Sequence, residues 1–74
     1  MPKLPTLTSK KLVKVLVKLG FEKHRQKGTS HLVMVHNDKR RCVIPMHSGD
    51  IPKGTLKSIL RSIDVGVDEL ISLF

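Results

Sequence analysis

Apolar residues recur at helical spacing near the start of the chain. Within 10–19 they fall three or four residues apart, at Leu12, Val15, Leu16 and Leu19. This spacing puts them on one face of an amphipathic helix. Thr8 or Ser9 supplies its N-cap, and Gly20 is a typical residue to end it.

Three segments of strand character follow. Segment 21–26 is weak in composition, 30–36 is the strongest, and 40–44 ends at Pro45. Two short turns, 27–29 and 37–39, separate them. Such short connections predict an antiparallel meander.

The central segment is apolar on both faces. Leu32 and Met34 point one way, and Val33 and Val35 point the other. One face must pack on helices. The other is either covered by a neighbouring element or offered to a partner chain.

A second helix is expected from Pro52, which suits a first helical position, to about Ser62. Segment 64–66 breaks it, and Asp68 then caps a short terminal helix. The order is therefore α-β-β-β-α plus a terminal helix, with two helices on one face of a three-stranded antiparallel sheet. We expect an α+β fold and a single domain over 1–74, in which 1–7 is an irregular lead-in.

Charge then narrows the class of partner. Fourteen Lys and Arg oppose six Asp and Glu, giving a formal net charge of +8, which attracts phosphate. The cations repeat every four residues along both predicted helices, at Lys10, Lys14 and Lys18 and again at Lys53, Lys57 and Arg61. Such stripes are often only solvated helix faces, but with few acids nearby we favour contact with RNA or a protein partner.

Several other classes of protein are disfavoured. There is no long uncharged apolar run, and 1–8 lacks the apolar core of a signal peptide, so a cytoplasmic location without membrane association is expected. His31 and His36 are five apart on one strand and project from opposite faces, so we expect no metal site. No glycine pattern typical of nucleotide loops is present, and no cofactor is expected. Cys42 is expected to be a buried, inert thiol, and His24 and His36 to be solvated strand residues.

What remains is acid–base chemistry on a phosphodiester. RNA carries its own nucleophile, the 2′-hydroxyl, so an enzyme needs to move protons and stabilise charge on phosphorus. His31 follows a glycine turn at the entry to the strongest strand and is the candidate acid or base. From patterning alone, an ordinary surface histidine is the competing interpretation.

Four stretches of the chain resemble the HicA family of toxins. They are Leu19-Gly20-Phe21, Gln26-Lys27-Gly28-Thr29-Ser30-His31, Val43-Ile44-Pro45-Met46-His47-Ser48-Gly49 and Pro52-Lys53-Gly54-Thr55-Leu56-Lys57-Ser58-Ile59-Leu60. They occur in family order, and the resemblance spans about 10–74.

The resemblance implies a metal-independent mRNA endonuclease with a fold like the double-stranded-RNA-binding domain. It also implies a type II toxin that a HicB antitoxin neutralises. The family's catalytic histidine matches His31, and its loop histidine matches His47, which would serve as an accessory proton donor, a phosphate contact or a structural residue. Candidate RNA contacts are Lys27, Gly28, Ser30, Lys53 and Lys57. The strand lacks the aromatic residue of many members, so backbone contacts must carry more of the binding.

Two alternatives from other classes stay open. The chain could be a non-catalytic module that binds double-stranded RNA by shape and phosphate. It could also be a domain that binds only protein.

Overall fold

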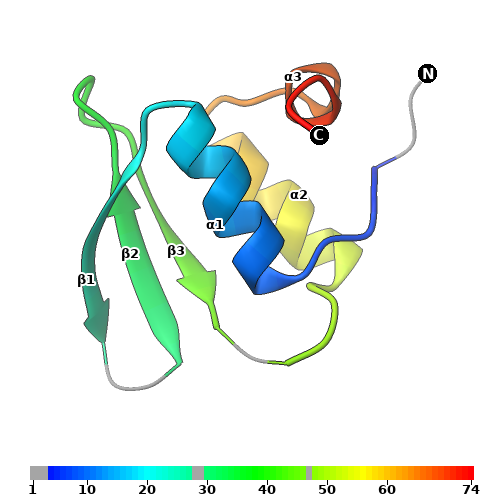
Figure 1. The fold of residues 1–74 in the computed structure, drawn as a ribbon, viewed down its shortest axis with the longest axis horizontal. Helices are drawn as coiled ribbons and strands as arrows, with labels where there is room; N and C mark the ends of the chain where they lie inside the picture. Colours follow the sequence, from blue (N-terminus) through cyan, green and yellow to red (C-terminus); the bar gives the residue numbers. More distant parts are fainter. Residues whose placement is uncertain (1–3, 28–29, 47) are drawn as a thin grey trace.

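A computed structural model describes residues 4–27, 30–46 and 48–74. Its elements are α1 (Ser9–Lys18), β1 (Glu22–Lys27), β2 (His31–Val35), β3 (Arg41–Pro45), α2 (Lys53–Ser62) and α3 (Val67–Ile71). The predicted α-β-β-β-α order with a short terminal helix is confirmed. Figure 1 shows α1 and α2 on the same side of the sheet.

The three strands form an antiparallel sheet with β2 in the middle. His31 begins β2 opposite Lys27 of β1 and Pro45 of β3. A register shift between Lys23 and Arg25 leaves His24 as the extra residue of β1. The meander predicted from the two short turns is therefore correct.

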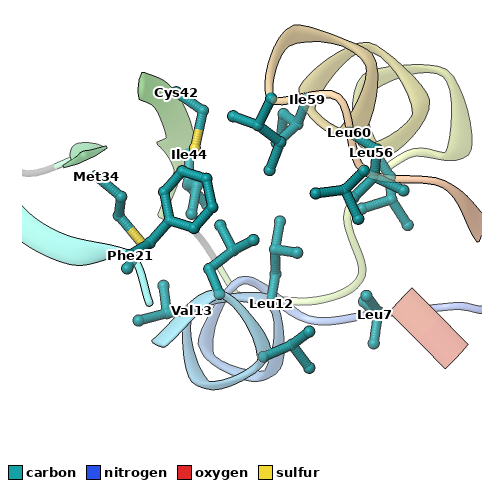
Figure 2. Close-up of a cluster of buried hydrophobic side chains, with 14 of the residues drawn as sticks. Leu7, Leu12, Val13, Phe21, Met34, Cys42, Ile44, Leu56, Ile59 and Leu60 are labelled. Atoms are coloured by element: carbon teal, nitrogen blue, oxygen red, sulfur yellow. The ribbon is translucent and has the colours of Figure 1, made fainter. Parts of the chain in front are cut away.

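The core is aliphatic and lies between the helices and one face of the sheet. Leu12 and Leu16 of α1, Met34 and Ile44 of the sheet and Leu56 of α2 are completely or almost completely buried. Figure 2 shows these layers facing one another, with Phe21, the one buried aromatic ring among the described residues, beside Met34 and Ile44. Burial on this scale is the main source of stability in so small a domain.

The chain before α1 contributes more to the core than its irregular appearance predicts. Leu7 is 1% exposed, and Leu4 packs against the same cluster. The Leu7 carbonyl oxygen also accepts a hydrogen bond of 2.7 Å from the Ile51 N–H, and the backbones of Thr8 and Asp50 form an isolated antiparallel β-bridge. These contacts hold the lead-in against the segment that precedes α2.

The second face of the sheet carries the other apolar side chains of the central strand. Val33 and Val35 point away from the helices, and no helix of the described part of the chain lies over them (Figure 1). Val33 is nonetheless only 1% exposed, because Arg25 and Val43 on the flanking strands lie directly opposite it. Val43 is 47% exposed on this face.

The helix ends confirm some predictions and correct two. Thr8 caps α1, its hydroxyl accepting a hydrogen bond of 3.2 Å from the Lys11 N–H. Pro52 is wrong as a first helical residue, since its extended backbone places it just before α2. Asp68 is wrong as the cap of α3, because Gly66 holds the extended N-cap conformation and Asp68 lies in the first turn.

His36 is another correction, because it is a structural residue and not a solvated one. β2 ends at Val35, and the following turn folds the His36 ring over Phe21, with ring centroids 5.0 Å apart. Its Nε2 lies 3.1 Å from the Leu19 carbonyl oxygen at the end of α1. His24, in contrast, is exposed as predicted.

Cys42 is buried, as predicted. Burial raises the pKa of its thiol to about 11, so that the protonated form dominates at neutral pH. A thiol in that state is a poor nucleophile.

Candidate nucleic-acid interface

His31 occupies the first position of β2, with an exposed side chain on the face opposite the helices. The Ser30 hydroxyl lies 3.1 Å from its Nδ1. The backbone beneath it is fixed, because the Met46 N–H donates a hydrogen bond of 2.6 Å to the Ser30 carbonyl oxygen. An exposed ring on a fixed strand end can reach a large substrate.

A buried serine connects this strand end to α1. Ser9 is 2% exposed, and its hydroxyl donates a hydrogen bond of 2.6 Å to the carbonyl oxygen of Pro45, the residue opposite His31. The sequence predicts Ser9 only as an alternative N-cap. No local signal distinguishes a serine with this long-range partner from an ordinary capping residue.

Both long helices begin at the end of the molecule where β2 starts and β3 ends (Figure 1). Neither has an acidic residue in its first turn. Lys10, Lys11 and Lys53 are exposed there instead. Helix N-termini carry partial positive charge, so these lysines and the two helix starts favour an anion at this end.

The predicted RNA contacts are only partly placed. Lys53 and Lys57 are exposed on α2, and Ser30 is exposed beside His31. Gly28, His47 and the Lys27 side chain lie outside what the structure describes. Only the backbone of Lys27 is described, and it pairs with His31 between β1 and β2.

The structure divides the lysines of α1 into two sets. The Lys11 ammonium lies 5.0 Å from the centre of the Phe74 ring, and Lys18 donates a hydrogen bond of 3.1 Å to the Leu73 carbonyl oxygen. These two therefore contact the segment after α3. Lys10 and Lys14 line a hollow on the opposite side, facing β1.

Two adjoining hollows lie on the helix side of the sheet. One, of about 510 Å³, is lined by Thr8, Ser9, Lys10, Met46, Ser48 and Gly49. The other, of about 340 Å³, lies between α1 and β1 and shares Lys10 and Met46 with the first. His31 lines neither of them, because its ring is on the other face of the sheet.

The described ranges hold neither a metal cluster nor a membrane span. In 4–27, 30–46 and 48–74, no group of three His, Cys, Asp or Glu side chains is arranged to hold a metal ion. None of the helices in those ranges has the length and apolar character needed to cross a membrane.

Comparison with known proteins adds one decisive match. A sequence model of the family described as the HicA toxin of bacterial toxin–antitoxin systems matches residues 9–65. The chain belongs to the HicA toxin family. The matched span runs from the first residue of α1 through the whole sheet and α2, so it includes His31 and both cationic helices.

Membership of the HicA family gives the function in outline. HicA proteins are toxins of toxin–antitoxin systems and in general ribonucleases, and a cognate antitoxin and an RNA substrate go with that role. No curated protein matches the chain.

Proposed function

We propose that this HicA toxin is an mRNA endonuclease that needs no metal ion and uses His31 as general acid or base. The observation that carries the proposal is the position of His31. It is an exposed imidazole on a fixed strand end, at the end of the molecule where two helices begin without acidic residues.

The chemistry requires two proton transfers and stabilisation of negative charge. One group removes the proton of the 2′-hydroxyl as its oxygen attacks phosphorus, and another gives a proton to the departing 5′ oxygen. An imidazole can do either at neutral pH. A cationic side chain stabilises the phosphorane, and we assign this role to Lys27, whose backbone pairs with His31, and assign Lys53 and Lys57 to other phosphates of the RNA.

The remaining predicted residues have supporting roles in this proposal. Ser30 orients the His31 ring through the contact at Nδ1. Gly28 lets the RNA backbone approach the turn closely, and His47 is the accessory proton donor or a phosphate contact. The second helix places Lys53 and Lys57 one turn apart on an exposed face.

Neutralisation by a HicB-type antitoxin completes the proposal. An antitoxin that covers the His31 face would exclude RNA without altering the fold. The substrate, mRNA, implies action in the cytoplasm.

The test compares cleavage of labelled RNA by wild type and His31→Ala in the presence of EDTA. Loss of a general acid or base lowers the rate by about 10²–10⁴-fold. We therefore expect the variant to lose cleavage while its circular dichroism spectrum stays unchanged. His24→Ala is the matched control, because His24 is an exposed histidine on the neighbouring strand.

Cleavage by His31→Ala at the wild-type rate would show that His31 is not the catalytic group. A salt-sensitive RNA complex without cleavage by wild type would instead support the non-catalytic RNA-binding module. Negligible affinity for RNA at moderate salt would support a domain that binds only protein.

A further inference from the structure

The hollow between α1 and β1 combines positive charge with an apolar floor. Lys10 and Lys14 of α1 and Lys23 of β1 form its rim. Val13, Leu32 and Met46 form its floor, and all three are buried or half-buried. We call it the α1–β1 groove.

Its lysines are not neutralised by acidic side chains of the described ranges. The ion pair there joins Asp38 to Arg40, with the His36 ring beside the same carboxylate, at the other end of the molecule. Lys10, Lys14 and Lys23 are all exposed. The positive potential of the rim is therefore available to an anionic ligand.

The spacing of the rim suits a chain of phosphates. Lys10 and Lys14 are four residues apart on α1, which corresponds to a rise of about 6 Å. This is comparable to the separation of neighbouring phosphates along one nucleic-acid strand. Lys23 faces them from β1, so a backbone lying in the groove would meet cations on both sides.

The floor decides between single-stranded and double-stranded RNA. A concave apolar surface accepts an unstacked base or the face of a ribose, whereas a duplex keeps its bases stacked and presents its grooves and phosphates. The groove volume of about 340 Å³ is at the lower end of the range for small-ligand sites, so it suits one nucleotide.

The groove also leads toward His31. Gln26 lines it from β1, and the next residue, Lys27, pairs with His31 in the sheet. Successive residues of a strand point to opposite faces. A strand of RNA that crosses the edge of the sheet at this point would therefore pass from the groove to the face that carries the imidazole.

We propose that the α1–β1 groove binds a nucleotide of single-stranded RNA beside the cleaved bond, with phosphates on Lys14 and Lys23 and the base or ribose on the apolar floor. The choice of RNA as ligand rests on the proposed function. The site itself adds a substrate contact on the helix side of the sheet.

The experiment measures binding of a labelled ten-nucleotide oligouridylate to His31→Ala protein, which prevents cleavage, over a range of salt concentrations. Lys14→Gln and Lys23→Gln are introduced together. Each single-strand phosphate contact contributes about 0.7 to the slope of log K against log salt, or about fivefold in affinity at 0.1 M salt relative to 1 M. We expect the slope to fall by about 1.4 and affinity at 0.1 M salt to fall about 25-fold.

Two further variants separate the contribution of the rim charges from that of the apolar floor. Lys39→Gln removes one exposed cation from the β2–β3 turn, at the other end of the molecule, and serves as the charge control, for which the slope should stay unchanged. Met46→Ser removes part of the floor and should weaken binding without changing the slope. A 16-base-pair RNA duplex should show little difference between the parent and the double lysine variant.

An unchanged slope in the double lysine variant would overturn the groove proposal, as would an equal loss with Lys39→Gln or a loss confined to the duplex. These results are independent of the cleavage test. If His31→Ala abolishes cleavage but the lysine variants bind normally, His31 catalysis stands and the groove does not. If the groove binds single strands but wild type never cleaves, the groove stands and His31 catalysis does not.

Discussion

At the scale of single residues, the contact between Ser30 and His31 controls how the imidazole meets a substrate. The hydroxyl lies 3.1 Å from Nδ1 and can donate to it or accept from it. If the hydroxyl donates, the neutral ring carries its proton on Nε2, which can then only donate a hydrogen bond to the substrate. If the hydroxyl accepts from Nδ1–H, Nε2 of the neutral ring is free to act as a base, and Nε2–H of the imidazolium can act as an acid.

Removing this contact should weaken catalysis without abolishing it. A neutral hydrogen bond contributes about 0.5–1.5 kcal/mol, so Ser30→Ala should lower kcat by about 2- to 10-fold. RNA affinity should change little, and Ser30→Thr should restore most of the rate. Ser58→Ala, on the exposed face of α2, is the control. A kcat of Ser30→Ala equal to that of wild type would mean that the hydroxyl does not orient the ring.

At the scale of elements, the end of α1 shows a local signal and a tertiary contact acting on the same residue. Gly20 has φ +99°, a conformation in which a side chain is strained. A methyl group at this position would also lie 2.9 Å from Nε2 of His36. Periodicity alone indicates that the helix stops here, whereas the close approach of His36 exists only in the fold.

Gly20→Ala should therefore destabilise the protein. The strained backbone costs about 1–3 kcal/mol, and His36 must also shift away from the Leu19 carbonyl oxygen. Gly54→Ala is the matched control, because Gly54 lies in α2 with open space around it and should gain up to about 1 kcal/mol from higher helix propensity. Urea denaturation gives both values. Equal stability of Gly20→Ala and wild type would contradict the contact.

At the scale of the whole molecule, the proposed catalytic group and the hydrogen bonds that join the sheet to the helix C-termini lie at opposite ends of the fold. One end holds His31 and the starts of α1 and α2. At the other end, two residues of the β2–β3 turn donate hydrogen bonds to the C-terminal ends of the helices. His36 donates to the carbonyl oxygen of Leu19, just after α1, and Arg40 donates to the carbonyl oxygen of Ile63, just after α2, at 2.7 Å. Donors at helix C-termini are favourable, because the carbonyls there carry partial negative charge. This arrangement joins the sheet and both long helices away from the proposed catalytic group.

Asp38 makes this far end sensitive to acid. Partial desolvation raises its pKa, but hydrogen bonds from the Arg40 backbone and guanidinium and the nearby charges outweigh that effect and hold the pKa below the ordinary 3.8. A carboxyl whose pKa is lowered by folding stabilises the fold at pH values above its ordinary pKa. This stabilisation is lost as the pH falls through the lowered pKa.

Asp38→Asn should consequently lower the melting temperature at pH 7. The difference from wild type should shrink as the pH falls below about 4, because wild type then protonates Asp38. Asp64→Asn is the control, since exposed Asp64 has no ion pair with another residue of the described ranges and its positive φ suits asparagine. A melting-temperature difference that stays constant between pH 7 and pH 2 would contradict the role of the charge.

The sequence by itself determined the order of the elements and the faces that α1 and α2 bury. Apolar spacing in α1 and α2 is a local signal, because helix geometry fixes which side chains share a face. Strand geometry likewise puts His31 on the face of β2 opposite Leu32 and Met34, but only the packing of the helices decided that this pair points into the core.

Only the tertiary structure decided which distant residues meet. Ser9 reaches Pro45, 36 residues away, and His36 closes on the end of α1. Lys14 and Lys23 come to face each other across the α1–β1 groove, while Lys11 and Lys18 turn to the C-terminal segment. The reason is physical: spacing along the chain governs what a residue does within its own helix or strand, whereas contacts between elements depend on how their buried faces pack together.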